Sequence, residues 1–438
     1  MGARASLARR RLRGAEDRTR MPTVSSAFLA DVPPRPQAAS GALLAALAIA
    51  QMGAFLSFMP LLTILAPLKA AAIDPDNKAW ILAQVGFWGA LVAGGANILA
   101  GALSDSTRSR FGRRRPWMLI GVIGTAASCF VIMRADSTPG LVGGVLLFQL
   151  CLNLLFGPLV ALLADLVPPT QRGRAAAFIG LAPPAGAMTG ALLVGVALPQ
   201  ESVRYAVIAG LLVAATIPVL LLARETSTGP RVFRLARPQR LQAWRPFRLT
   251  RDFAVAWLSR LLVQAGITIV SLFTLFNIQD RAALPGRLAP EALLGLLVVG
   301  SSLVQIAASL AGGFLSDHLR RRKAFVLAAG LMVAAATVLL AFSADWRLMA
   351  CAFAIFGAGY GVFTAVDAAL ITEVLPSDRD AGRDLGLSNL ANTLPQMFAP
   401  LLGAVLLQNA AGYAWLYLAA GAAAAVGGLL ILAVRRAR

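Results

Sequence analysis

The chain has 438 residues, of which 58% are hydrophobic and only 14% are charged. Soluble domains carry about 25% charged residues, so this composition excludes an ordinary soluble protein. A membrane-spanning helix needs roughly 20 apolar residues, and runs of that length recur from Gly41 almost to the C-terminus. The runs lack the polar–apolar alternation of spanning strands. The composition therefore predicts an all-α integral membrane protein.

Taken in chain order, the apolar runs predict twelve transmembrane helices. They cover residues 41–68, 79–103, 116–135, 140–165, 175–198, 203–223, 253–277, 290–314, 324–343, 347–375, 385–408 and 412–434. Residues 1–40 hold eight arginines and no apolar run, so they are predicted to form a disordered basic arm. The first run has full span length, so we expect no cleavable signal peptide. Met21 is a second candidate start.

The net charge of +20 is distributed unevenly between the predicted connections: 32 of the 40 basic residues fall in alternate connections and at the two termini. The positive-inside rule explains this pattern better than nucleic-acid binding does. Both termini are therefore predicted to be cytoplasmic, in a cell membrane (inner or plasma membrane) whose lipids surround the chain. Residues 225–251 form the longest polar connection and hold seven arginines; we expect them to lie on the anionic inner leaflet.

Short internal repeats indicate that the chain is duplicated about this connection. "GALSD" at 101–105 ends the second span and "GFLSD" at 313–317 ends the eighth. "ADLVP" at 164–168 and "TEVLP" at 372–376 end the fourth and tenth spans. The predicted organisation is an N-terminal arm (1–40), a six-helix half (41–224), a linker (225–251), a second six-helix half (252–434) and a basic tail (435–438).

The loop "SDSTRSRFGRRRPW" after the second span resembles the signature loop of the major facilitator superfamily. The matching residues are Gly101, Asp105, Gly112, Arg113 and Arg114; their counterparts in the second half are Gly313, Asp317 and Arg321. Glycine permits close helix approach, and an aspartate can pair with the arginines. The resemblance implies gating contacts that form when the cytoplasmic side closes, while simple topology anchors are the alternative. The second loop departs from the pattern, with Arg320 in place of the usual glycine.

The spacing of this loop narrows the resemblance. Four extra residues separate Asp105 from Gly112, and "SD…RSRFGRRRP" is similar to the glycoside–pentoside–hexuronide cation symporters, in particular the plant sucrose–proton symporters and their bacterial relatives. Segments 257–280 and 360–396 resemble the same bacterial branch. The resemblance implies two pseudo-symmetric halves that rock about a central site, and uptake of a sugar or glycoside with a proton or sodium ion.

Two charged residues fall within predicted spans and need a reason to be there. Arg260 lies in the seventh span, where an arginine costs about 2.5–3.5 kcal/mol to insert. Asp367 lies in the tenth span, which runs antiparallel to the seventh, so both charges are expected at a similar depth. We predict an ion pair, because paired charges cost less to bury than single ones. The pair either carries a proton or substrate hydroxyl, or is static and structural.

Neutral polar residues at helical spacing complete the predicted substrate and ion site. The site comprises Arg260, Asp367, Gln264, Gln149, Asn153, Tyr360, Asn392, Gln396 and Trp88. Neutral donors and acceptors with an aromatic ring suit a sugar, and Phe273 is a second candidate ring. The alternative for each amide is a hydrogen bond between helices. Pro183 and Pro184 are predicted to break or kink the fifth span.

Other functions remain open at this point. The Ala-, Leu- and Gly-rich helices also suit a proton-coupled exporter of an amphipathic molecule, and the same scaffold can serve as a transport-inactive assembly or sensing factor. A membrane enzyme is disfavoured because no catalytic motif is present. His318 is the single histidine and the three cysteines fall in apolar runs, so we expect no metal or cofactor. We expect a monomer.

Overall fold

In the part of the chain that the computed structural model describes, twelve helical units follow one another, one at each predicted span. The structure describes residues 39–109, 111–168, 171, 175, 179–223, 250–284, 286, 288–374, 381–408 and 412–435, with the backbone alone at 164, 372 and 381–387. Within these residues, eleven helices are long and apolar enough to cross a membrane, and the remaining unit, Ala182–Ala197, is shorter. The predictions for the arm, the linker and the tail lie outside the described residues, apart from a few flanking positions.

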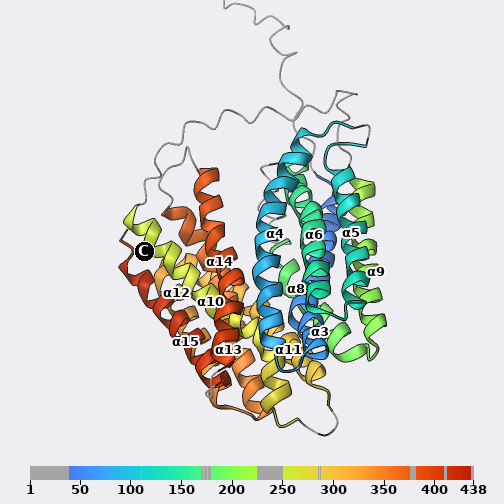
Figure 1. Ribbon diagram of the computed structural model, residues 1–438. Coiled ribbons are helices and arrows are strands. Elements are labelled where there is room, and N and C mark those ends of the chain that lie inside the picture. The colour runs from blue at the N-terminus through green and yellow to red at the C-terminus, as the bar shows by residue number, and fades with distance from the viewer. Residues whose placement is uncertain are drawn as a thin grey trace, which may run out of the picture. The chain divides into compact units, whose positions relative to one another are not determined.

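The first six units make up the N-terminal half and the last six the C-terminal half (Figure 1). The first six are α2 (Gly41–Pro60) with η2 (Leu61–Leu65) and α3 (Ala66–Ile73), α4 (Lys78–Ser106), α5 (Arg115–Met133), α6 (Thr138–Leu166), α8 (Ala182–Ala191) with η3 (Leu192–Ala197), and α9 (Glu201–Leu222). The last six are α10 (Arg251–Arg281), α11 (Pro290–Leu319), α12 (Arg322–Phe342), α13 (Trp346–Glu373), α14 (Ala381–Leu407), and α15 (Gly412–Leu430) with η4 (Ile431–Ala433).

The first span is longer than predicted. Its helix continues to Ile73 instead of ending near residue 68. Lys69, the first residue beyond the predicted span, is charged. In the structure Lys69 stays in the helix, donates a 2.6 Å hydrogen bond to the Met133 carbonyl and pairs with Glu201 at 3.0 Å. Pro60 does not end the helix either, since a π-helical turn at Leu61–Leu65 follows it and absorbs the missing hydrogen bond.

The fifth span is interrupted where its two prolines were expected to break it. The helix at residues 179–180 stops at a turn at Leu181, and α8 then begins with Pro183 and Pro184 in its first turn. Proline is tolerated there because the first amides of a helix have no partner in the helix. The break leaves the unit that follows it, Ala182–Ala197, shorter than the other spans.

The two halves repeat the same packing. In the N-terminal half α4 packs on α6, α5 on α6 and α9, and α2 on α8 and α9. The corresponding helices of the C-terminal half make the same pairs: α11 with α13, α12 with α13 and α15, and α10 with α14 and α15. The halves meet mainly through two equivalent contacts, α4 with α14 and α8–η3 with α11 (Figure 1). This matched pairing is the duplicated architecture that the repeats predicted.

Glycines fix the close approach of α11 and α13. A Cβ atom on Gly357 would clash with the Ser301 carbonyl, and one on Gly361 would clash with the Gln305 carbonyl. Small residues four apart allow helices to approach at backbone distance. The residues between and before these glycines, including Tyr360 and Phe356, are consequently held at a fixed position relative to α11.

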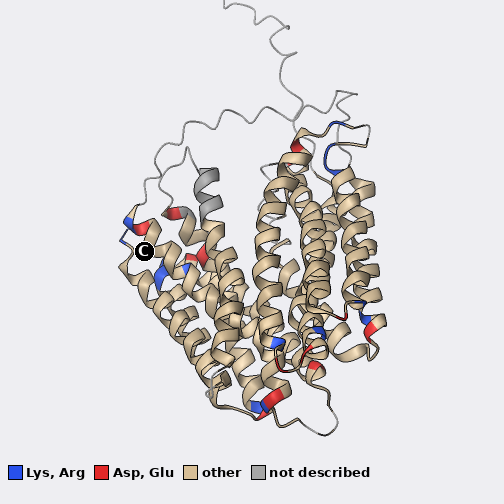
Figure 2. Ribbon diagram, viewed as in Figure 1, with Lys and Arg blue, Asp and Glu red and all other residues tan. Residues whose placement is uncertain are grey.

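Charged residues gather toward the two ends of the helices (Figure 2). We call the end that carries the α4–α5 connection (107–114) and the α11–α12 connection (320–321) the basic end. The opposite end carries the connections at 74–77, 198–200 and 282–289. The apolar midsections between the two ends match the hydrocarbon thickness of a bilayer.

Candidate functional site

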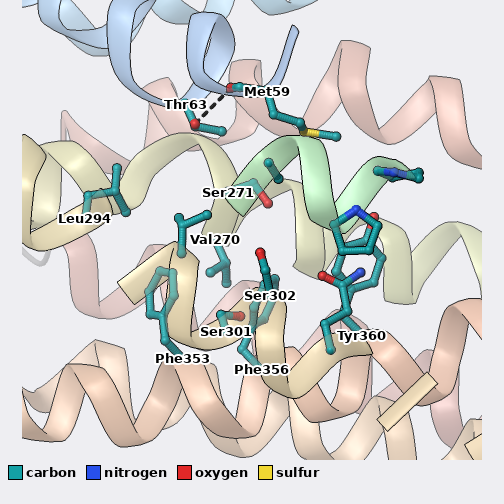
Figure 3. Close-up of a pocket in the computed structure, with 15 residues that line it drawn as sticks. Met59, Thr63, Val270, Ser271, Leu294, Ser301, Ser302, Phe353, Phe356 and Tyr360 are labelled. Carbon is teal, nitrogen blue, oxygen red and sulfur yellow. Dashed lines mark hydrogen bonds between the residues drawn. The ribbon is translucent and has the colours of Figure 1, made fainter. Parts of the chain in front are cut away.

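A cavity of about 100 Å³ lies between the two halves (Figure 3). Five helical segments line it: the α2–η2 junction and α8 from the first half, and α10, α11 and α13 from the second. The lining residues are Met59, Thr63, Pro183, Pro184, Ala187, Val270, Ser271, Leu294, Val298, Ser301, Ser302, Gln305, Phe353, Phe356 and Tyr360. A mostly apolar pocket with a few convergent polar groups is the usual form of a small-molecule site.

The polar groups of the cavity are neutral and come mainly from the C-terminal half. Ser271, Ser301 and Ser302 supply hydroxyl groups, as Figure 3 shows, and Gln305 and Tyr360 supply an amide and a phenol. None of the fifteen lining residues, all of them in the described part of the chain, is charged. The cavity can therefore offer hydrogen bonds without demanding a counter-charge from its ligand.

The N-terminal half supplies a largely apolar wall. Met59, Pro183, Pro184 and Ala187 line the cavity from this half. Thr63 is the polar exception, and its hydroxyl donates a 2.9 Å hydrogen bond to the Met59 carbonyl within its own helix. The break before α8 brings the two proline rings to this wall.

Aromatic rings run along one face of α13. Phe353 and Phe356 lie 6.0 Å apart between ring centroids, and Phe356 and Tyr360 are also 6.0 Å apart. The Tyr360 hydroxyl is hydrogen bonded to the Gln264 side chain of α10. Ring faces of this kind can stack on an apolar face of a ligand.

Among the predicted site residues, Tyr360 lines the cavity, and Gln264 contacts the Tyr360 side chain without lining the cavity itself. The sequence did not single out the polar residues of α11, although "SSLVQ" at 301–305 places three of them on neighbouring turns. Phe273 was proposed as a stacking ring, but it is fully buried against Gly403 of α14.

Three predicted residues of the N-terminal half lie elsewhere, on α4 and α6. Trp88 is 46% exposed on α4, with its ring 5.1 Å from that of Phe87. Gln149 is buried beside Gly89. The Asn153 amide donates to the Gln149 carbonyl at 2.8 Å, and its oxygen accepts from Asn97 at 3.3 Å. The asparagine contacts are hydrogen bonds along and between helices, the alternative that the sequence left open.

The predicted ion pair between α10 and α13 is present. Arg260 Nη1 lies 3.3 Å from Asp367 Oδ2. Arg260 also donates to two residues of α14: Nη1 to Ser388 Oγ at 3.2 Å and Nε to Asn392 Oδ1 at 3.1 Å. Asp367 and Ser388 are buried. The guanidinium thus connects three helices, and the predicted ligand Asn392 uses its amide oxygen for this contact.

The pair lies between the cavity and the basic end. Gln264 is one helical turn from Arg260, and Tyr360 is seven residues, or about 10 Å, from Asp367. Gln396, one turn beyond Asn392, lies at the interface between the halves, where its carbonyl faces Gly86 of α4 at a distance of 3.5 Å from an ideal Cβ. Polar residues therefore recur along α10 and α13 between the cavity and the ion pair, and the ion pair contacts α14.

At the basic end, Arg114 organises a cluster in the N-terminal half. It contacts Asp105 at 2.7 Å, Asp165 at 3.1 Å and the Ser104 hydroxyl at 2.6 Å, while Arg113 contacts Asp165 at 2.8 Å. Burial of the Asp165 carboxylate would raise its pKa, but the hydrogen bonds and charges of Arg113 and Arg114 outweigh burial and lower the pKa. The predicted pairing of Asp105 with the arginines is confirmed.

The C-terminal half repeats this cluster, but its central arginine is Arg322 and not the predicted Arg321. Arg322, one position after the predicted Arg321, contacts Asp317 at 2.9 Å and Glu373 at 2.5 Å. Arg321 is exposed and precedes α12 as its N-cap. Because the loop after Asp317 is four residues shorter than the loop after Asp105, Arg321 corresponds to Arg113 and Arg322 to Arg114; the sequence prediction named only the first of these two counterparts.

Both loops turn through left-handed backbone. Gly112 has φ of 93°, and Arg320, where the usual signature has glycine, has φ of 51°. Arg320 therefore adopts the conformation that glycine would favour. The prediction that Gly101 allows close helix approach is wrong, because a Cβ there would meet nothing within 4 Å. Gly157 of α6 makes that approach instead, against Ala100. A Cβ at Gly313 would make only an ordinary contact, at 3.6 Å.

Two repeated bundles of membrane-crossing helices with an uncharged cavity between them define a polytopic membrane transporter. The chain matches the family model of the Major Facilitator Superfamily over residues 41–290 and 282–438. It belongs to this superfamily, and it is a transporter rather than an enzyme. Within the described residues, no group of three His, Cys, Asp or Glu side chains could hold a metal ion.

Solved structures of transporters share the fold. The nucleoside transporter NupG is 13% identical, with a TM-score of 0.65 over 90% of this chain and 98% of that one. The peptide transporter POT in complex with sulfate is 14% identical, with a TM-score of 0.69 over 90% of this chain and 94% of that one. At such identities the likeness shows the fold alone. No curated protein matches the chain.

Proposed function

We propose that this protein is a secondary active transporter that works by alternating access and takes up a neutral, hydroxylated small molecule of the sugar or glycoside class. The observation that carries the proposal is the cavity between the halves, where hydroxyl, amide and phenol groups meet aromatic rings and no charged side chain. Sugar hydroxyl groups require neutral donors and acceptors, and the ring carbons of a sugar pack on aromatic faces.

The uncharged lining of the cavity favours a neutral, hydroxylated ligand over a charged one. A nucleoside, the ligand class named for NupG, is neutral and carries a hydroxylated ring, so it suits the same groups. A peptide, the class named for POT, is zwitterionic and needs charged partners because unpaired charges are costly to bury. The loop resemblance to the glycoside–cation symporters supports the sugar among the neutral ligands.

Coupling to a cation is assigned to Asp367. In the proposed cycle, protonation of its carboxylate removes the charge that holds Arg260, whose guanidinium already donates to Ser388 and Asn392. The arginine then binds α14 alone. Because α14 packs on α4 of the other half, this change reaches the interface that must move. A sodium ion at the carboxylate would act in the same way.

The basic end is proposed to face the cytoplasm of a cell membrane, with a monomer as the working unit. Lysine and arginine concentrate in the connections of that end and at both termini, as the positive-inside rule requires. The cavity would then open inward through the basic end and outward through the opposite end.

An exporter of an amphipathic molecule is the second candidate. The specific observation in its favour is the apolar lining that Met59, Pro183 and Pro184 contribute to the same cavity as the serines. A ligand with one apolar and one hydroxylated face would use both walls. Direction of transport distinguishes this candidate from the first.

Transport by purified protein in proteoliposomes tests the proposal. We expect an inward proton or sodium gradient to drive accumulation of one member of a panel of radiolabelled sucrose, maltose, pentosides and nucleosides. Ser302→Ala and Tyr360→Phe should raise the KM for that solute. Ser128→Ala is the matched control, because its hydroxyl is buried on α5 and bonds the Thr125 carbonyl.

The same preparation separates the alternatives. Gradient-dependent efflux of an amphipathic dye with no uptake of any glycoside or nucleoside would favour the exporter. Absence of both activities in folded protein would leave a transport-inactive scaffold. For coupling, Asp367→Asn should abolish accumulation against a gradient while leaving exchange of solute across the membrane; loss of neither would exclude Asp367 as the coupling site.

A further inference from the structure

Two ion pairs at the opposite end join the N-terminal half to the C-terminal half. Lys78 Nζ, at the start of α4, lies 2.5 Å from Asp280 Oδ1 near the end of α10. Arg204 Nη2 of α9 lies 3.1 Å from Glu291 Oε1 in the first turn of α11. The partners are 202 positions apart in the first pair and 87 in the second, so tertiary structure alone brings them together.

Each pair is supported by further contacts, within one half or, for Lys78 and Phe276, between the halves. The second oxygen of Asp280 accepts a 2.5 Å hydrogen bond from the Tyr413 hydroxyl, and Lys78 lies 5.1 Å from the centroid of the Phe276 ring. Arg204 is only 7% exposed and donates to the Leu198 carbonyl at 2.7 Å. Preorganised charges of this kind lose little side-chain entropy on pairing, unlike ordinary surface ion pairs.

Backbone contact between the halves accompanies the pairs. A Cβ on Gly195 would lie 2.7 Å from the Glu291 carbonyl, and one on Gly295 would lie 2.8 Å from the Ala191 carbonyl. On the other flank, a Cβ on Gly86 would lie 2.7 Å from Pro400. Both contacts between the halves are therefore tight toward this end, one flank carrying Lys78 and the other Arg204.

The clusters at the basic end have a different arrangement. Arg114 pairs with Asp105 and Asp165 of its own half, and Arg322 pairs with Asp317 and Glu373 of its own half. Those ion pairs therefore hold each bundle together, whereas Lys78–Asp280 and Arg204–Glu291 hold the two bundles to each other.

We propose that Lys78–Asp280 and Arg204–Glu291 form a two-point latch that closes the opposite end, and that this end opens only when both pairs separate. The inference goes beyond the proposed function: it specifies the gate on one side and is independent of the substrate. It rests on the proposed transport function only because it requires the two halves to move relative to each other. Such a latch excludes ligand from one side while the other side exchanges it.

Labelling of a cysteine in the cavity tests the latch without knowledge of the substrate. Ser302→Cys is placed in a background without Cys129, Cys151 and Cys351, and its reaction with a membrane-impermeant maleimide is measured from each side of the membrane. In the latched protein, we expect slow labelling from the side of the α10–α11 connection. Asp280→Asn combined with Arg204→Gln should make that labelling several-fold faster.

The chain provides a matched control for this experiment. Lys69 and Glu201 form a 3.0 Å ion pair at the same end, but both belong to the N-terminal half. Lys69→Gln should leave labelling unchanged from either side. In the Arg204→Gln background, the charge exchange Lys78→Asp with Asp280→Lys should restore the slow labelling that Lys78→Asp abolishes there.

Cross-linking gives an independent measurement that does not depend on weakening the fold. A disulfide between Lys78→Cys and Asp280→Cys should prevent labelling of the Ser302→Cys thiol from that side, and reduction of the disulfide should restore this labelling. Equal labelling of latched, unlatched and Lys69→Gln proteins would overturn the proposal, as would unimpaired opening of the cross-linked protein. Either result would leave the substrate and coupling proposals standing, because neither measurement involves a transported solute.

Discussion

The two halves of this transporter share one packing scheme but differ in what they bury. The second half holds an arginine, an aspartate, an asparagine and a serine in one contact between α10, α13 and α14, and it supplies most polar groups of the cavity. The first half contributes mainly apolar atoms to the same cavity. The two copies thus share one scaffold, whereas the Arg260–Asp367 contact and most polar groups of the cavity belong to the second copy.

The largest effect should come from breaking the buried ion pair of the second half. Asp367→Leu leaves the Arg260 guanidinium without its counter-charge, and removing one partner of a buried pair costs about 3–5 kcal/mol. Thermal unfolding in detergent should show a large loss for this variant. In the first half, Asn153→Leu removes neutral hydrogen bonds and should cost about 1 kcal/mol.

The double variant Arg260→Gln with Asp367→Asn sharpens this result. Because no charge remains buried, most of the lost stability should return, whereas transport coupling should not. Equal stability of Asp367→Leu and the wild type would show that Arg260 is adequately paired by Ser388 and Asn392 alone.

The second largest effect concerns the spacing of α11 and α13. Gly361→Ala places a methyl group on the Gln305 carbonyl, and overpacking of this kind costs about 1–3 kcal/mol. It should also raise the KM for the solute, because Tyr360 moves relative to α11. Gly94→Ala on α4 of the first half is the control, since a Cβ there meets nothing within 4 Å; its unfolding temperature should not fall.

A smaller difference is expected between the two clusters at the basic end. The Arg114 side chain is 6% exposed and the Arg322 side chain 24% exposed. Arg114→Gln should therefore destabilise the protein more, by about 2 kcal/mol against about 1 kcal/mol for Arg322→Gln. Denaturation of the purified variants measures both values. A larger loss for Arg322→Gln than for Arg114→Gln would show that burial of the arginine does not determine the stability that each cluster contributes.

The smallest effect should be a gain in stability. Arg320 holds a left-handed conformation that costs a residue with a Cβ about 1 kcal/mol, and Arg320→Gly should recover about that amount. In the first half, Gly112→Ala should lose a similar amount because Gly112 has φ of 93°. Opposite shifts in unfolding temperature for these two variants would support the equivalence of the loops.

The sequence was sufficient for the fold because apolar runs and basic connections each follow from one physical requirement, the bilayer. It was also sufficient for the Arg260–Asp367 contact, because two lone charges in apolar spans have few ways to be satisfied. It was not sufficient for Ser301 and Ser302. Serines in membrane helices often bond their own backbone, so their presence does not indicate which way they face.

Two other predictions failed, one for a local reason and one because of packing between helices. Whether Arg321 or Arg322 makes the contact depends on where α12 begins. That start follows the left-handed residue Arg320, and the left-handed conformation cannot be predicted from an arginine in the sequence. Trp88 and Phe273 have the same aromatic character and were treated alike, yet one is half exposed on α4 and the other fully buried. Which face of a helix meets a neighbour is decided by packing between elements distant in sequence.

The glycine contact between α11 and α13 has a consequence for the transport cycle. Because Gly357 and Gly361 lie against carbonyl groups of α11, the two helices have no room to slide or tilt separately and behave as one rigid piece. The distances from Ser301 and Gln305 to Tyr360 then stay constant while the transporter changes state. A change in the shape of the cavity must then involve its other lining segments, which are α10 and the proline-bearing wall of the first half.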